Sequence, residues 1–261
     1  MSYVSVQNVQ KIYGDRVILE KVNLSVAEHE FISIVGASGC GKSTFLRMLL
    51  AQEQPSRGQI SIAGGPPSLE PDGDRGVVFQ RYSVFPHLTV RDNILTAQEF
   101  ETGGFLGRFF GDKRKAAYVE AQQTLDRIGL GHVAKAFPSA LSGGMLQRLA
   151  IAQALAGRPK ILLLDEPFGA LDPGTRLSMH DFLQDLRAEV GITVFMVTHD
   201  LEEAFKLGDR VIVFDKPRWD PQNPEAFGAT ITYDFDARHG GVPFQEAREM
   251  VFHKKENSHA A

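Results

Sequence analysis

The stretch Gly36-Ala37-Ser38-Gly39-Cys40-Gly41-Lys42-Ser43 constrains the fold of this chain more than any other part of the sequence. It fits the pattern G-x-x-x-x-G-K-[ST], whose glycines let successive backbone N–H groups turn inward toward phosphate oxygens. A short apolar run at 31–35 precedes it, and a run rich in Leu and Met at 45–51 follows. This order predicts a buried strand, a phosphate-binding loop and a helix whose positive N-terminal end faces the phosphate. The alternative, a chance glycine-rich turn, does not explain the flanking strand and helix.

The rest of the chain alternates between strand and helix patterns. Apolar residues on a period of two predict strands at 4–9 and 17–26, and shorter apolar runs predict strands at 59–63 and 76–80. Helical patterns dominate from about 89 to 159, with the clearest helices at 112–128 and 142–156. Further strands are predicted at 161–164, 191–197, 210–214 and 229–235, with helix starts at Asp172-Pro173 and Asp200. Strands that alternate with helices imply an α/β fold with a parallel sheet covered on both faces.

Composition excludes several classes of protein. The 261 residues are 43% hydrophobic and 23% charged, which is ordinary globular usage and excludes disorder or a fibrous repeat for the whole chain. The net charge of −4 argues against a protein held to nucleic acid by bulk charge. A single cysteine, Cys40, allows no disulfide within the chain and favours a reducing compartment. We expect no secretory signal at the start and no membrane span, since no apolar run approaches about 18 residues; any role at a membrane would then need a partner.

Two further motifs carry charge or exposed N–H groups. The apolar run 161–164 ends in Asp165 and Glu166. Asp165 suits a Mg²⁺ shell and Glu166 suits activation of an attacking water, although an acidic surface turn is an equally good reading of this pair alone. Leu141-Ser142-Gly143-Gly144-Met145 opens a predicted helix with a Ser cap and two glycines, which makes a second anion-binding helix end. For an isolated Ser-Gly-Gly, an ordinary capped helix would be the preferred reading.

In this order, from residue 3 to about 214, the three motifs resemble the nucleotide-binding subunit of an ATP-binding cassette (ABC) transporter. The resemblance implies a P-loop NTPase of the ABC ATPase type, with a RecA-like core, an antiparallel β subdomain and a helical subdomain. It places the ATPase domain at 1–235, with the helical subdomain inserted at about 81–158. Residues 236–261 would form a C-terminal extension with a partly disordered tail, and 254–261 is expected to be frayed. The roles of 103–111 and of the chain after 235 stay open.

The resemblance also assigns roles that the residues alone do not. Tyr13 would stack on adenine, Gln80 would sense Mg²⁺, Asp172 would contact the opposing subunit and His199 would contact the γ-phosphate. Without the resemblance, Tyr13 would be interpreted as a half-buried residue at a strand end and His199 as a structural histidine. The expected catalytic residues are Glu166, His199, Gln80 and Lys42, and the expected Mg²⁺ ligands are Ser43, Gln80 and Asp165. Nucleotide contacts are expected from Tyr13, Gly36, Ala37, Ser38, Gly39, Cys40, Gly41, Lys42, Ser43, Thr44, Ser142, Gly143, Gly144 and Asp172.

The family works as a head-to-tail homodimer that holds ATP between the phosphate loop of one copy and the Ser-Gly-Gly motif of the other. The resemblance therefore implies a peripheral ATPase at the cytoplasmic face of the plasma membrane, with a membrane-spanning permease, a solute-binding protein and no nucleic acid as partners. The stretch 80–93 would receive a helix of the permease, with Tyr82, Phe85 and His87 on its surface; Phe85 packing between subdomains is the alternative.

The sequence says least about which solute is transported and which branch of the family the chain resembles. Met145 stands where the family usually has Gln, which resembles importers for nitrate, sulfonates and taurine, and 228–235 is similar to ATPases linked to urea or guanidine metabolism. A soluble cassette protein acting on nucleic acid or ribosomes, an exporter cassette and a regulatory, non-catalytic cassette are the alternatives. The solute is selected by other subunits, so this chain does not specify it.

Overall fold

The structure is a computed structural model that describes residues 2–65, 70, 73–80, 83–103, 112–218, 220, 222–223, 225–238 and 241–258. Its contacts divide the chain into two compact units, one formed by Met1–Pro71 with Thr193–Ala261 and the other by Asp72–Ile192. Within the described ranges, no helix combines the length and the apolar character that crossing a bilayer requires.

The first unit contains a small antiparallel sheet in the order β2-β1-β4. Its central strand β1 buries Val4, Val6 and Val9, the alternation that the sequence predicts for a strand with one covered face. Val4 pairs with Val26 on one side and with Ile62 on the other. The strands are β1 (Val4–Tyr13), β2 (Arg16–Val26) and β4 (Arg57–Ile62), which confirms the strands predicted in this part of the chain.

Within its described residues, the same unit contains four strands of a second sheet, which pair in both parallel and antiparallel directions. β3 pairs in parallel with β7 and β8, with Ile34 opposite both Val197 and Ile212. All residues of β7 are buried, as a central parallel strand requires. β9 runs antiparallel to β8, so this edge strand departs from the parallel pairing of β3 with β7 and β8. The elements are β3 (Phe31–Gly36), α1 (Lys42–Leu49), β7 (Thr193–Val197), α6 (Leu201–Leu207), β8 (Arg210–Asp215) and β9 (Thr230–Asp236).

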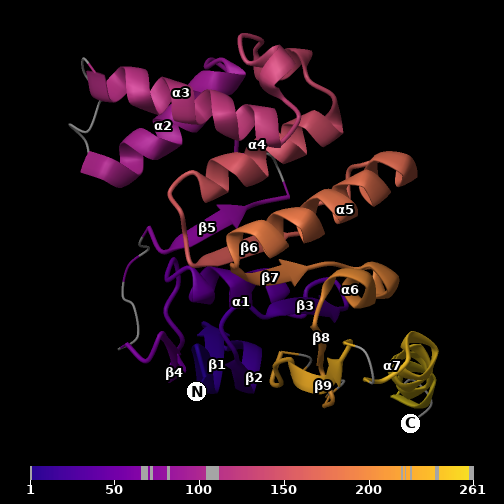
Figure 1. Ribbon diagram of the computed structural model, residues 1–261. Helices are drawn as coiled ribbons and strands as arrows, with labels where there is room; N and C mark the ends of the chain where they lie inside the picture. The colour runs from indigo at the N-terminus through magenta and orange to yellow at the C-terminus, as the bar shows by residue number, and fades with distance from the viewer. Residues whose placement is uncertain are drawn as a thin grey trace. The chain divides into compact units, whose positions relative to one another are not determined.

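A helix that the sequence did not predict, α7 (Phe244–Ser258), follows β9 and lies beside it (Figure 1). Ala247 is fully buried in a cluster with Val211 and Phe235, and the Tyr233 hydroxyl donates to the Met250 carbonyl over 3.2 Å. Residues 254–258, where a frayed polar end is expected, belong to α7, and the partly disordered tail stays a prediction. The face of α7 that packs against this cluster contains few apolar residues. The helical period of its hydrophobicity is therefore too weak to predict a helix from the sequence.

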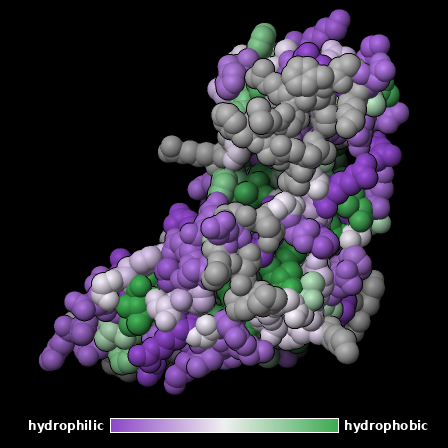
Figure 2. All heavy atoms as spheres, turned by 90° about the vertical axis from the view of Figure 1, so that its left-hand side faces the viewer, coloured by the Kyte–Doolittle hydropathy of each residue, from purple (hydrophilic) through white to green (hydrophobic). Residues whose placement is uncertain are grey.

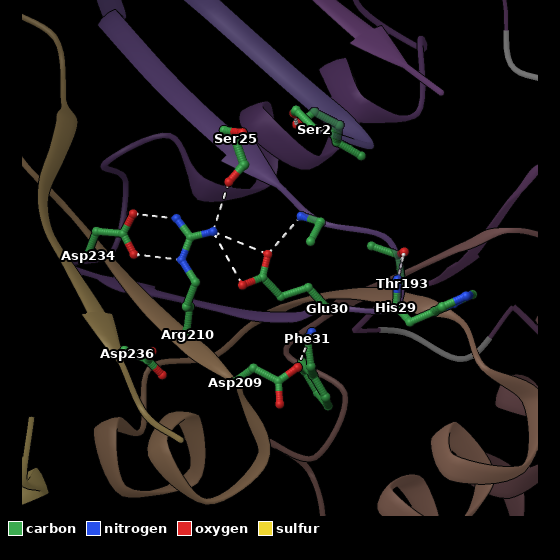
Figure 3. A network of polar contacts seen from close by, with 12 residues as sticks. Ser2, Ser25, His29, Glu30, Phe31, Thr193, Asp209, Arg210, Asp234 and Asp236 are labelled. Carbon is green, nitrogen blue, oxygen red and sulfur yellow. Dashed lines mark hydrogen bonds and ion pairs between the residues drawn. The ribbon is translucent and has the colours of Figure 1, made fainter. Parts of the chain in front are cut away.

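Arg210, at the start of β8, joins β2 of the small sheet to β8 and β9 through a polar network (Figure 3). Its guanidinium donates to both oxygens of Asp234 over 3.0 and 2.5 Å, to the Ser25 carbonyl over 2.8 Å and to Glu30 over 3.2 Å. Glu30 in turn accepts from the Ala27 N–H over 2.9 Å. The hydrogen bonds to Asp234 raise the pKa of Arg210 in spite of its partial burial. Paired charges of this kind hold β2, β8 and β9 in one arrangement.

The second unit combines one parallel strand pair with a group of helices (Figure 1). Three helices, α2, α3 and α4, contact one another around an apolar core that includes Ile94, Leu125 and Leu149. This arrangement confirms the helical character predicted between about 89 and 159. The elements are β5 (Arg75–Val78), α2 (Val90–Gly103), α3 (Asp112–Arg127), η2 (Gly131–Val133), η3 (Pro138–Ala140), α4 (Gly143–Leu155), β6 (Ile161–Asp165) and α5 (Pro173–Val190).

Most apolar side chains of both units are buried, and few large ones are exposed. On the face shown in Figure 2, hydrophobic residues form small separate groups among hydrophilic ones. Tyr13 is among the exposed large side chains, with 44% of its surface accessible. Part of the ring is therefore accessible at the end of β1, which fits both a stacking residue and a half-buried residue at a strand end.

Candidate functional site

The glycine loop follows β3 directly, and backbone angle favours glycine at three of its positions while space requires it at two of them. Gly36, Gly39 and Gly41 have φ values of 155°, 78° and 95°, which side chains disfavour. A Cβ on Gly36 would lie 2.3 Å from the Phe214 carbonyl oxygen, and one on Gly41 would lie 2.8 Å from Leu19 Cδ2. The loop therefore has the strand, turn and helix order that the sequence predicts, and its backbone passes too close to its neighbours for larger residues.

Lys42, the first residue of α1, places its ammonium group over this loop. The side chain is buried, with 7% of the residue exposed, and Nζ donates to the carbonyls of Gly36 and Ala37 over 2.8 and 3.0 Å. Gly41 provides no side-chain cap to α1, and the first turn of the helix has no acidic residue. A cation, a positive helix end and a backbone loop thus converge where an anion would bind.

His199 follows β7 and lies at the same loop. It lines a cavity of about 270 Å³ together with Gly36, Ala37 and Ser38. Asp215, at the end of β8, and Tyr233 of β9 line the same cavity. The structure therefore brings His199 to the phosphate loop within the first unit, as the prediction requires.

Tyr13 ends β1, and its hydroxyl hydrogen-bonds the carboxylate of Glu53. Lys11 Nζ lies 4.9 Å from the centre of the Tyr13 ring and 3.1 Å from Glu53 Oε2. Sequence reasoning missed both Lys11 and Glu53. The only signal that could have found them is a basic residue two positions before Tyr13, because Glu53 is remote in sequence.

In the second unit, Asp165 ends β6 and Glu166 follows it with a φ of 48°. Positive φ is uncommon for a residue other than glycine, and strained backbone of this kind gathers at functional sites. β5 pairs in parallel with β6, with Val78 opposite Leu164, so both strands end at one edge. There the Gln80 amide donates to Glu166 Oε2 over 3.2 Å. The structure thus brings Gln80 and Glu166 together, and their roles toward Mg²⁺ and water stay predictions.

The Ser-Gly-Gly motif begins α4 as the sequence predicts. Ser142 is the N-cap, and its hydroxyl accepts from the Met145 N–H over 3.4 Å. A Cβ on Gly144 would lie 2.5 Å from Thr175 Cγ2, so a glycine is needed where α4 approaches α5. The first turn of α4 has no acidic residue, and Ser142 and Gly143 are exposed. This helix end is capped and remains open to an anion.

Asp172 caps α5, which confirms that part of its prediction. Its carboxylate accepts from the Thr175 N–H over 3.0 Å. Hydrogen bonds from the Thr175 side chain and backbone lower the pKa of Asp172. The carboxylate is thus ionised and exposed near neutral pH, and its predicted contact with a second copy stays a prediction.

The loop expected to meet a membrane partner is fixed by one buried side chain. Asn93 is fully buried, and its amide bonds the N–H and carbonyl of Phe85, the Leu88 carbonyl and the Thr89 carbonyl over 2.7–3.3 Å. His87 lies exposed beside the half-buried Phe85, with ring centres 6.1 Å apart. Tyr82 and residues 104–111 lie outside the described residues.

A model of the ABC transporter family matches residues 19–169. The chain is 43% identical over 216 residues to the bicarbonate transport ATP-binding protein CmpC of Synechococcus elongatus, which is 81% of this chain and 31% of that protein. The nitrate import ATP-binding protein NrtC of the same organism is also 43% identical, over 81% of this chain and 32% of its own length. The chain thus spans about a third of these two relatives. A putative ATP-binding protein of Brucella abortus is 45% identical, over 80% of this chain and 77% of that protein.

Solved structures of similar fold include a dimeric post-hydrolysis state of the ATP-binding cassette MJ0796 bound to ADP and phosphate. The TM-score is 0.71 at 32% identity, and the match covers 90% of this chain and 99% of that one. Another dimeric structure of that bacterial transporter cassette gives a TM-score of 0.72 at the same identity.

Proposed function

Since the chain belongs to the ABC transporter family, we propose that it binds ATP with Mg²⁺ and hydrolyses it to drive uptake of a small solute through a membrane partner. The observation that carries this proposal is the position of Lys42, whose ammonium lies over the glycine loop at the uncapped start of α1. A buried cation beside a glycine loop and a helix N-terminus suits a polyphosphate better than a neutral ligand.

The predicted metal ligands suit Mg²⁺ in chemistry. Ser43, Gln80 and Asp165 offer hydroxyl, amide and carboxylate oxygens, the donors that this hard cation prefers. Three protein ligands at most leave positions for water and phosphate, as is usual for Mg²⁺ with nucleotides. Bound Mg²⁺ would neutralise charge that builds up on the β- and γ-phosphates.

The remaining roles follow from what phosphoryl transfer needs, which is mainly positioning and charge stabilisation. Lys42 would hold the phosphates, and His199, which lines the same cavity as the loop, would bond the γ-phosphate. Glu166 would accept the proton of the attacking water. The hydrogen bond from Gln80 fixes one oxygen of that carboxylate, so Gln80 would set its direction.

We infer a homodimer in which the Ser142–Gly144 helix end of one copy faces the phosphate loop of the other. Two anion-binding helix ends would then share one triphosphate, so the site is complete only when the pair closes. Because ATP would bind the closed state better, binding would favour closure and phosphate release would favour opening. The dimeric cassettes of similar fold support this arrangement.

Phe85 and His87, on the loop held by Asn93, are proposed as the contact for a membrane-spanning permease. Such a permease, with a solute-binding protein, would place the chain at the cytoplasmic face of the plasma membrane. The bicarbonate and nitrate proteins among its relatives support an importer for small solutes of the nitrate, sulfonate or taurine type. An exporter cassette or a soluble non-transport cassette is the alternative.

The proposal is tested by measuring ATP binding and phosphate release by the purified chain, with and without Mg²⁺. We expect Mg²⁺-dependent hydrolysis that increases when the membrane partner and its solute are present. Solute-dependent stimulation in vesicles distinguishes an importer from a soluble cassette protein. A chain that binds no ATP at millimolar concentration would contradict the proposal.

A further inference from the structure

Three charged side chains surround the hydroxyl end of Tyr13. Lys11 comes from β1, Arg47 from the last turn of α1, and Glu53 from the turn that follows α1. The Tyr13 hydroxyl donates a hydrogen bond to the carboxylate of Glu53. The end of β1 is thus tied to the helix that begins in the phosphate loop.

Glu53 is held firmly enough to serve as an anchor. Its carboxylate lies 3.1 Å from Lys11 Nζ and 3.6 Å from Arg47 Nη1, and its side chain is only 20% exposed. Its backbone N–H bonds the Arg47 carbonyl over 3.3 Å, which fixes the turn. Burial alone would raise the pKa of Glu53, but hydrogen bonds from Tyr13 and Lys11 outweigh it and lower the pKa. The anchor is therefore an ionised carboxylate with three partners.

Lys11 occupies one face of the Tyr13 ring. Its ammonium lies 4.9 Å from the ring centre, a cation–π distance, and also donates to the Gln54 carbonyl over 2.9 Å. The Lys11 side chain is only 12% exposed, whereas Tyr13 is 44% exposed. A planar ligand would therefore meet the ring on the face that Lys11 leaves open.

We infer that Glu53 and Lys11 are positioning residues that hold Tyr13 as a one-sided platform for the adenine base of ATP. The inference rests on the proposed function, since it takes Tyr13 as the stacking residue. A free tyrosine side chain must lose rotamer freedom when a base binds, and an anchored one has lost it beforehand. The two residues would raise the affinity for the base without touching the phosphates.

The test compares two probes, ATP and inorganic tripolyphosphate, both with Mg²⁺, by calorimetry on the whole chain. Tripolyphosphate has the phosphates without the nucleoside, so the ratio of the two affinities measures the contribution of the nucleoside, and the Tyr13 variants report on its base. We expect Glu53→Gln and Tyr13→Phe each to weaken ATP binding about 3- to 10-fold, and to leave tripolyphosphate binding unchanged. Glu53→Gln removes the negative charge that faces Lys11 and Arg47, whereas Tyr13→Phe removes the hydroxyl, so the double variant should bind ATP at least as weakly as either single one.

Further variants separate the effect of positioning Tyr13 from the effect of its aromatic ring and from a loss of the fold. Tyr13→Ala should bring ATP affinity down toward that of tripolyphosphate, and Lys11→Met, which keeps the aliphatic stem, should lower it in the same direction as Glu53→Gln. Glu120→Gln breaks an exposed ion pair with Arg158 in the other unit and should change neither affinity. A melting temperature for each variant shows whether the fold is retained.

The inference fails if Tyr13→Ala lowers the ratio of ATP affinity to tripolyphosphate affinity while both Glu53→Gln and Tyr13→Phe leave that ratio unchanged. Stacking of the base on Tyr13 would still be supported by that result. Equal weakening of both probes by Glu53→Gln would also overturn it, because that is the effect of a purely structural residue. If Tyr13→Ala leaves the ratio unchanged, the stacking role falls as well. A wild-type chain that binds neither probe would contradict the proposed function itself.

Discussion

Gln80 and Glu166 are joined by a hydrogen bond of 3.2 Å between the Gln80 amide and the Glu166 carboxylate, although 86 positions separate them in the chain. The parallel pairing of β5 with β6 produces this contact, because it brings the two strand ends to one edge. The backbone of Glu166 also lies in the left-handed region, with a φ of 48°, so the extended conformation of β6 ends before this residue. A carboxylate oriented by an amide is a suitable acceptor for a proton from water.

The first prediction concerns this carboxylate. Glu166→Gln should slow ATP turnover by roughly 10²–10⁴, because an amide has no basic oxygen to take the proton of the attacking water. ATP should still bind, since the proposed role of Glu166 is to accept a proton and not to hold the phosphates. Phosphate release and calorimetry measure the two quantities separately, with Glu120→Gln as the matched control. Hydrolysis at the wild-type rate would remove Glu166 from the role of base.

The second prediction concerns the loop. Lys42→Ala should lose most of the affinity for ATP, since it removes the cation that lies over the carbonyls of Gly36 and Ala37. Calorimetry measures the change. Lys160→Ala is a fitting control, because Lys160 forms an exposed ion pair with Asp74 in the other unit and its loss should leave ATP binding unaltered. Unchanged affinity in Lys42→Ala would contradict the phosphate-loop interpretation.

The third prediction concerns stability. Arg210→Met should lower the free energy of unfolding by about 1–3 kcal/mol, because it leaves the carboxylates of Asp234 and Glu30 without their cation. The range lies below that of a fully buried pair, since Asp234 is 40% exposed. Arg238→Met breaks the exposed pair with Asp236 and should change stability by less than about 1 kcal/mol. Equal melting temperatures for the two variants would show that the Arg210 network adds no stability.

Local motifs were predictable from the sequence, and contacts between distant segments were not. The glycines of the phosphate loop, the caps Ser142 and Asp172 and the alternation in β1 are set by neighbouring residues, so their positions follow from pattern alone. The role of Gln80 needed a family resemblance, because its partner lies on another strand. Glu53 and α7 were missed for the same physical reason. Glu53 is defined by its hydrogen bond with Tyr13, and α7 by the packing of Ala247 against Phe235 of β9. Neither contact leaves a periodic pattern in the sequence.

The last prediction concerns the shared site. Ser142→Arg should abolish steady-state hydrolysis and leave ATP binding to the monomer intact. The long side chain would project from the exposed start of α4 and, in the proposed dimer, obstruct the phosphates held by the second copy rather than those held by its own phosphate loop. Ser142→Ala is the matched control: it removes the hydroxyl that caps Met145, which costs about 1 kcal/mol, without adding bulk.

Light scattering in a Glu166→Gln background, where ATP is bound and not consumed, measures whether the pair forms. Glu166→Gln alone and with Ser142→Ala should dimerise when ATP is added, and the variant with Ser142→Arg should stay a monomer. The comparison separates obstruction from loss of the cap, because the two substitutions differ in bulk and both remove the hydroxyl. An ATP-dependent dimer of the Ser142→Arg variant would show that this helix end does not face the nucleotide of a second copy.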